Sequence, residues 1–150
     1  MSVAIVREPS VSECYPSGTD MIDLGQLIGT WRLVSAIAFA VDGRSLPPPY
    51  GPEPMGRLVL TESGRMMAVI CDGRVTLPKE EKRAYASYCG NYRLEADTLI
   101  TTVDAAAITD RLGSEQCRGL DFRDGYLVLI PPQRPDGERR ELFWRLDGPA

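Results

Sequence analysis

The feature that most constrains the fold is a succession of strand-forming runs separated by turn signals. The breaks between the runs carry pairs such as Asp42-Gly43 and Asp124-Gly125, which favour tight turns. Eight runs occupy residues 30–40, 56–61, 65–72, 91–95, 98–104, 115–123, 126–131 and 139–146. No repeat of βαβ units is present, so a parallel sheet is not expected. Eight antiparallel strands in sequence predict an all-β, up-and-down barrel, with a β-sandwich as the alternative.

Two helices are expected beside the strands. Thr19 and Asp20 precede apolar residues at helical spacing, which predicts a short N-terminal helix or 3₁₀ turn that ends at Gly29. Residues 78–88, with Pro78 at their start, predict one helix between the third and fourth strands. Residues 1–20 lack periodicity and predict a flexible tail, which leaves 21–150 as the barrel domain.

Composition excludes several classes of function. The net charge is −4 and no cluster of basic residues stands out, which argues against nucleic-acid binding. No apolar run is long enough to span a membrane. The chain contains no histidine, which removes the usual general base, most catalytic zinc sites and the common nucleophile arrangements. We therefore expect neither a metal nor a cofactor. The start of the chain lacks a signal-peptide pattern, so a cytoplasmic location with four free thiols is expected.

Several phrases of the sequence resemble, in the same order, the bacterial lipocalin-like domain family. They are Gly29-Thr30-Trp31-Arg32-Leu33-Val34-Ser35, Pro54-Met55-Gly56-Arg57-Leu58-Val59-Leu60-Thr61, Gly64-Arg65-Met66-Met67-Ala68, Tyr88-Cys89-Gly90-Asn91-Tyr92, Gly113-Ser114-Glu115-Gln116-Cys117-Arg118 and Leu142-Phe143-Trp144-Arg145. The resemblance covers residues 27–146 and implies a calycin-type barrel that binds small apolar molecules. It also implies that Trp31 packs at the closed end. Family members often carry histidine where this chain has Thr101 and Thr102.

Alternation along the strands assigns side chains to the interior. In the first strand Trp31, Leu33, Ser35, Ile37 and Phe39 share one mostly apolar face. Trp31 is expected to fill the barrel floor, where Gly29 lets the backbone turn close to it. The candidate ligand-binding residues are Ser35, Phe39, Leu58, Leu60, Met67, Tyr92, Thr101, Arg118, Phe122 and Trp144. The third strand is apolar on both faces, and its outer face suggests a homodimer.

Arg118 is the most informative polar residue. Alternation places it on the apolar face of its strand with Gln116 and Leu120. An unpaired buried charge is costly, so this guanidinium must have a partner. It either anchors a ligand carboxylate, phenolate or carbonyl, or stacks on Trp31 or Trp144, or pairs with an internal acid such as Asp104.

The leading functional hypothesis is non-enzymatic binding of a small hydrophobic or amphipathic molecule inside the barrel. The alternative is a cyclase or isomerase of secondary metabolism that uses the cavity as a reaction chamber. Its acid–base work would fall to Tyr92, Asp104, Glu115 or Tyr88, with Arg118 polarising a carbonyl. A third hypothesis is a structural or partner-binding domain. The sequence identifies neither the ligand nor catalytic residues.

Overall fold

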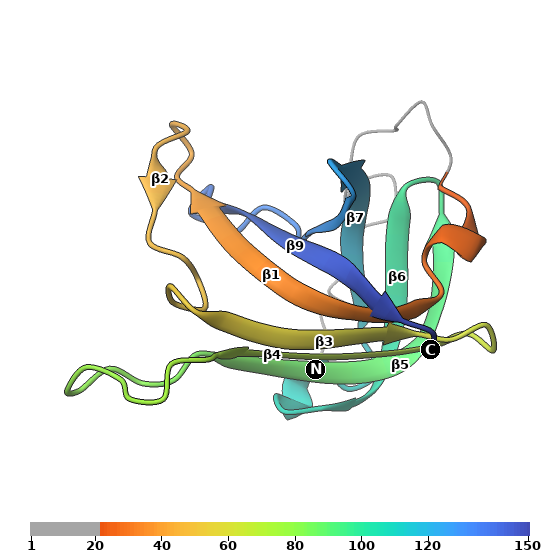
Figure 1. The fold of residues 1–150 in the computed structure, drawn as a ribbon, viewed down its shortest axis with the longest axis horizontal. Coiled ribbons are helices and arrows are strands. Elements are labelled where there is room, and N and C mark those ends of the chain that lie inside the picture. Colours follow the sequence, from red (N-terminus) through yellow and green to blue (C-terminus); the bar gives the residue numbers. More distant parts are fainter. Residues whose placement is uncertain (1–21) are drawn as a thin grey trace, which may run out of the picture.

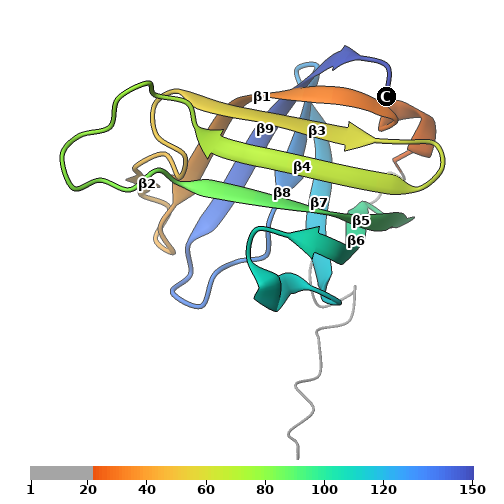
Figure 2. The ribbon, with the colours of Figure 1, turned by 90° about the horizontal axis from the view of Figure 1, so that it is seen from below.

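Residues 22–150 are described by a computed structural model, in which one antiparallel sheet closes on itself. Figure 1 shows the strands curling round a common interior, and Figure 2 shows β1, β3, β4 and β5 running side by side. The strands are β1 (Gly29–Phe39), β2 (Ser45–Leu46), β3 (Pro54–Leu60), β4 (Arg65–Asp72), β5 (Tyr85–Glu95), β6 (Thr98–Ala106), β7 (Glu115–Arg123), β8 (Tyr126–Ile130) and β9 (Arg139–Gly148). The predicted tail over 1–20 lies outside the described residues.

The first and last long strands close the barrel. β1 pairs with β3 on one side and with β9 on the other, in a register that runs from Thr30–Gly148 to Phe39–Arg139. The remaining neighbours follow the order of the chain, and β2 adds a two-residue pairing to the end of β1. The eight-stranded up-and-down barrel is therefore confirmed, and the β-sandwich alternative is wrong.

The predicted helix over 78–88 is wrong. Residues 73–84 form a loop, which projects beyond the barrel in Figure 1, and residues 85–88 already belong to β5. Pairing with β4 outweighs local helix propensity here, because Tyr88 lies opposite Ala68 and Tyr85 opposite Cys71. Glu80 has φ +70°, a left-handed conformation that is incompatible with a helix.

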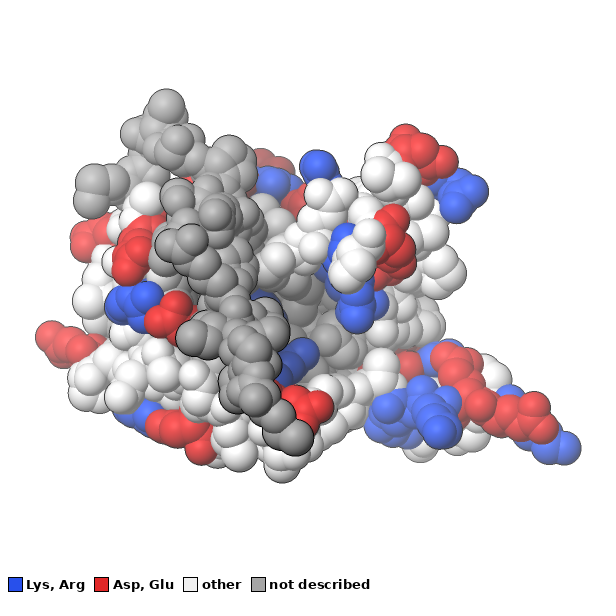
Figure 3. Space-filling model, turned by 180° about the vertical axis from the view of Figure 1, so that it is seen from behind, with Lys and Arg blue, Asp and Glu red and all other residues white. Residues whose placement is uncertain are grey.

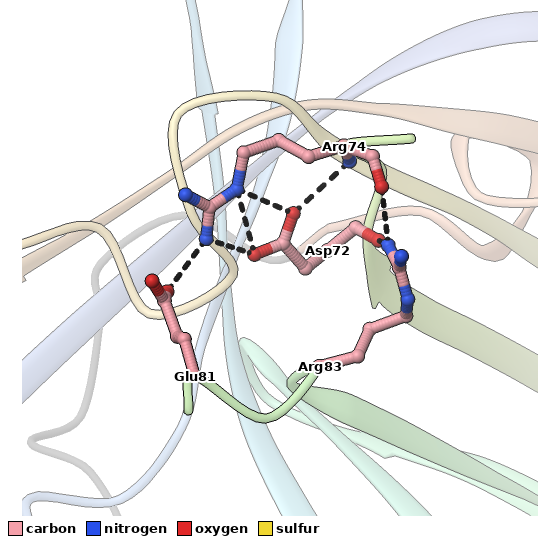
Figure 4. Close-up of polar contacts among 4 residues, drawn as sticks. All are labelled: Asp72, Arg74, Glu81 and Arg83. Carbon is pink, nitrogen blue, oxygen red and sulfur yellow. Dashed lines mark hydrogen bonds and ion pairs between the residues drawn. The ribbon is translucent and has the colours of Figure 1, made fainter. Parts of the chain in front are cut away.

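Asp72 and three loop side chains fix this loop (Figure 4). The Asp72 carboxylate is buried and accepts hydrogen bonds from Nε and Nη2 of Arg74, at 3.1 and 2.6 Å. Arg74 Nη2 also donates to Glu81 at 2.6 Å. Arg83 Nη1 donates to the carbonyls of Asp72 and Arg74, each at 2.6 Å. Glu81 and Arg83, which lie within the predicted helix, thus supply contacts that hold a loop.

Of the short helix or 3₁₀ turn expected before Gly29, the structure contains the 3₁₀ turn, η1 (Leu24–Gln26), and the helix is wrong. Asp23 caps it by accepting from the N–H of Gly25, while the Gln26 side chain accepts from the N–H of Asp23. Apart from η1 and a second 3₁₀ turn, η2 (Thr109–Arg111), residues 22–150 contain no helix.

The interior is closed at the end where β1 begins. Leu27, which follows η1, is fully buried in the interior cluster, and Trp31 is 3% exposed there. The indole Nε1 of Trp31 donates to the carbonyl of Leu27 at 2.9 Å. Gly29 has φ +149°, and a Cβ at this position would lie 2.8 Å from a methyl group of Leu146. Only glycine fits this close approach.

A β-bulge changes the faces of β1. The register with β9 shifts between Leu33 and Ser35, so Ala36 follows Leu33 into the interior cluster. Ser35 and Phe39 then fall on the opposite face from Ala36 and are half-buried. The prediction that they face inward is wrong, because the extra residue at the bulge shifts the alternation of inward and outward side chains by one position.

Candidate ligand-binding cavity

The barrel contains a cavity of about 440 Å³. Its apolar lining consists of Met66, Ala68, Ile70, Ala86, Tyr88, Leu129, Leu142 and Trp144. Tyr50, Arg111 and residues 131–135 surround it from the connecting loops. The starts of β5, β7 and β9 lie at one end of the barrel, because neighbouring strands are antiparallel. Trp31 is near the start of β1 and therefore lies at the opposite end. The barrel is thus closed at one end and hollow at the other.

Trp144 lines the cavity and carries a hydrogen-bond donor. It is fully buried, and its indole Nε1 has no hydrogen-bond partner among the described residues. A buried donor left without a partner costs about 1–3 kcal/mol. The hydroxyl of Thr101 is also buried without a hydrogen-bond partner among the described residues. Thr101 lies opposite Gln116 in the pairing of β6 with β7. The interior therefore offers unused hydrogen-bonding capacity next to its apolar surface.

Arg118 lies in the cavity wall over an aromatic ring. Its guanidinium carbon is 5.7 Å from the centroid of the Tyr88 ring, and that of Arg111 is 5.8 Å from the same ring. Arg118 also donates from Nη1 to the carbonyl of Cys117 at 2.8 Å, and from Nη2 to Oε1 of Gln116 at 3.4 Å. The predicted stacking is thus on Tyr88, not on Trp31 or Trp144. Asp104, the acid considered as its partner, instead pairs with Arg65.

The cavity lining is positively charged. It contains Arg111, Arg118, Arg134 and Arg140 against one acid, Glu115, so four positive charges less one negative leave +3. Arg134 and Arg140 approach Glu138 at 3.5 and 3.1 Å. Figure 3 shows a hollow on one face of the molecule with basic side chains beside it. This sign is opposite to the net charge of the chain, which is −4.

The structure divides the candidate ligand-binding residues. Arg118 and Trp144 line the cavity. Leu58, Leu60 and Thr101 are buried but are not part of the cavity lining.

The other candidates lie elsewhere. Met67 is 55% exposed, since β4 turns Met66 inward instead, and Phe122 is 37% exposed at the end of β7. Ser35 and Phe39 are displaced by the β1 bulge. The Tyr92 hydroxyl donates to the carbonyl of Thr61 at 2.6 Å, so this phenol is bonded to the backbone. Burial raises the pKa of the Tyr92 phenol above its ordinary value.

Residues 28–145 match the family model described as a lipocalin-like domain. The chain belongs to the lipocalin-like domain family. No curated protein matches it. Among solved structures, it is similar to an uncharacterized protein from Bacteroides eggerthii, at 13% sequence identity and a TM-score of 0.39, over 77% of this chain and 97% of that one.

Several cavity residues of this lipocalin-like domain were missed by sequence reasoning. Arg140 shares a face with Leu142 and Trp144, so the alternation of β9 would have found it. Tyr50 and Arg111 come from a proline-rich loop and from η2, and no periodicity marks them. Side chains in irregular segments reach the cavity only through the three-dimensional path of the loops.

The acid–base groups considered for catalysis have partners or lie outside the cavity. Asp104 accepts from Arg65 Nη2 at 3.0 Å, and this hydrogen-bonded pairing lowers the pKa of the Asp104 carboxyl. Its side chain is 52% exposed. Glu115 lines the cavity and forms an ion pair with Arg93 at 2.9 Å.

Among the described residues of the domain, no helix has the length and apolar character needed to cross a bilayer.

Proposed function

We propose that this lipocalin-like domain binds a small hydrophobic or amphipathic molecule in the cavity between β4, β5, β7 and β9. One observation carries the proposal: the barrel holds a cavity of about 440 Å³ behind a mostly apolar wall. Small-molecule sites are concave, largely apolar and equipped with a few polar groups, and this volume falls in their range.

The composition of the wall supports an apolar ligand. Met66, Ala68 and Leu142 are at most 5% exposed and belong to the interior cluster, yet they also line the cavity. A ligand in contact with them would bury its own apolar surface, which stabilises the complex by roughly 25 cal/mol per Å². Methionine adapts to irregular shapes, so Met66 suits a pocket that accepts a ligand.

The cyclase or isomerase is the less supported function. Its general acid or base would have to reach a ligand in the cavity, and Asp104 and Tyr92 are engaged outside its lining. Glu115 and Tyr88 do line it, but Glu115 is paired with Arg93. These contacts favour binding without chemistry.

Titration with N-phenyl-1-naphthylamine, a neutral apolar dye, tests the proposal. The dye is expected to fluoresce on binding at one site and to quench the emission of Trp144, which lines the cavity. Ala86 lies in the cavity wall and is only half-buried, so Ala86→Phe fills the space with little strain in the core. We expect this variant to bind at least about 10-fold more weakly, since its ring occupies ligand space.

Ala105→Phe is the matched control. Ala105 is an exposed residue of β6 that is absent from the cavity lining, so the same substitution there is expected to leave dye binding unchanged. Equal binding by the wild type and Ala86→Phe, or an equal loss in both variants, would overturn the proposed function. Thermal unfolding of each variant checks that the barrel is intact.

A further inference from the structure

The cationic groups of the cavity are not all neutralised by the protein. Arg134 and Arg140 share Glu138, and Glu115 is paired with Arg93 outside the lining. Arg118 and Arg111, in contrast, form no ion pair with any carboxylate among the described residues. Both are half-buried, and both lie beside apolar surface. Two guanidinium groups thus stand uncompensated at one site.

Tyr88 brings these two charges together. The two guanidinium carbons lie 5.7 and 5.8 Å from the centroid of one ring that is 7% exposed. The ring quadrupole attracts each cation only modestly and carries no net negative charge, so it does not neutralise the two guanidinium groups. A ligand anion beside these groups would accept charge-assisted hydrogen bonds from them.

A second, independent observation points to the same kind of ligand. Trp144 also lines the cavity, and its buried indole N–H has no acceptor within residues 22–150. This N–H and the two guanidinium groups are all donors, and they lie in a wall that also contains the apolar side chains of Met66 and Leu142. A ligand that satisfies them must supply acceptor oxygens.

We propose that the cavity selects an organic anion, with its carboxylate or sulfonate at Arg118 and Arg111 and its apolar body against Met66 and Leu142. The proposal deepens the proposed function and rests on it. The lining carries four arginines and one acid in a chain of net charge −4, so this part of the surface attracts an anion more strongly than the protein as a whole does.

Two dyes that share one aromatic skeleton test the charge preference. N-phenyl-1-naphthylamine is neutral, and 1-anilinonaphthalene-8-sulfonate carries one additional sulfonate. The wild-type domain is expected to bind the sulfonate at least about 10-fold more tightly, the size of one or more charge-assisted hydrogen bonds. Arg118→Gln is expected to weaken binding of the sulfonate at least about 10-fold more than binding of the neutral dye, because only the sulfonate loses a charge-assisted hydrogen bond. Thermal unfolding checks that the variant is folded.

Arg57→Gln is the matched control. Arg57 lies on the exposed face of β3 and donates from Nη1 to the carbonyl of the preceding residue at 2.9 Å, as Arg118 does at 2.8 Å. The substitution removes the same charge from the outside of the barrel, so the preference for the sulfonate should persist.

The outcomes separate the two proposals. If the neutral dye binds in the cavity but the sulfonate binds no better, the anion preference is wrong and the proposed function stands. If Arg118→Gln keeps the preference, or Arg57→Gln loses it, the sulfonate is held elsewhere and the inference is overturned. If neither dye binds, both proposals fail.

Discussion

At the scale of single residues, the two tryptophans show how one side-chain type serves two ends of a barrel. Trp31 is 3% exposed, and its N–H donates to Leu27 at 2.9 Å. Trp144 is fully buried, but its N–H has no partner within the described part of the chain. The first indole completes the closed end. The second combines apolar burial with an unused donor, which is the condition expected of a ligand site.

Replacement of each indole by phenylalanine distinguishes these roles. Trp31→Phe deprives the buried carbonyl of Leu27 of its donor, whereas Trp144→Phe removes a donor that made no bond. We expect Trp31→Phe to lower the free energy of unfolding by about 1 kcal/mol or more beyond the loss in Trp144→Phe. Urea denaturation of the two unliganded variants measures the difference. A larger loss in Trp144→Phe would contradict these assignments.

Arg118 shows what could and could not be predicted for a single residue. Alternation correctly placed it with Gln116 in the wall of the interior. Its aromatic neighbour could not be read from the sequence, because Tyr88 reaches it from β5 and the sequence does not give the distance across a barrel. The second guanidinium comes from η2, an element with no periodic pattern. For Arg118, the direction of the side chain was predictable and its partners were not.

At the scale of elements, the loop over 73–84 depends on one buried carboxylate. Hydrogen bonds from Arg74 lower the pKa of the Asp72 carboxyl more than burial raises it. Gly51 packs against the same group, since a Cβ there would lie 2.5 Å from Asp72 Oδ2. Asp72 thus joins two loops at the open end of the barrel.

Asp72→Asn is expected to release this loop. The amide keeps the shape but loses the charge that holds Arg74, so trypsin should cleave after Lys79 and Lys82 faster than in the wild type. Asp121→Asn serves as the control, because it breaks an exposed ion pair with Arg123 that contributes little. Unchanged cleavage in Asp72→Asn would show that the network does not hold the loop.

The same carboxylate predicts a pH dependence. Its pKa is lowered on folding, so its contribution to stability is complete above the ordinary aspartate pKa of about 3.9 and is lost as the pH falls through the lower folded value. The stability difference between wild type and Asp72→Asn should be constant between about pH 5 and pH 8 and should vanish in more acidic solution. Urea denaturation across this range measures it, and a difference that grows on acidification would contradict the sign.

Strands were more predictable than helices in this chain. Strand alternation and turn pairs gave the number and order of the long strands, because tertiary pairing reinforces both. The helix predicted over 78–88 is wrong because Tyr85 and Tyr88 pair with β4, and local propensity does not indicate this pairing. The bulge in β1 was not predicted for a related reason. It arises from a shift between Leu33 and Ser35 in the pairing with β9, a strand that is remote in the sequence.

At the scale of the whole molecule, closure creates two unlike ends. The turn at η1 and the indole of Trp31 fill one end, and a positively charged cavity occupies the other. The family resemblance predicted the barrel, but neither composition nor net charge indicated a basic interior in an acidic chain. The fold brings together four arginines from β7, β9, η2 and the loop before β9, and no pattern in the sequence predicts this arrangement.

The homodimer stays a prediction. Met55, Met67, Val69 and Tyr85 are each at least 43% exposed on the outer wall formed by β3, β4 and β5. Sedimentation velocity over a range of concentrations tests whether two copies associate, and Met67→Asp should abolish any dimer formed through this face. A dimer that persists in the variant would exclude the face as the interface.

A crystal structure of the domain grown with 1-anilinonaphthalene-8-sulfonate would show whether the cavity holds an organic anion. We expect the aromatic rings inside the barrel against Trp144 and Leu142, with the sulfonate within hydrogen-bonding distance of Arg118. A dye bound only on the outer wall, or side chains that fill the space between Met66 and Trp144, would contradict this expectation.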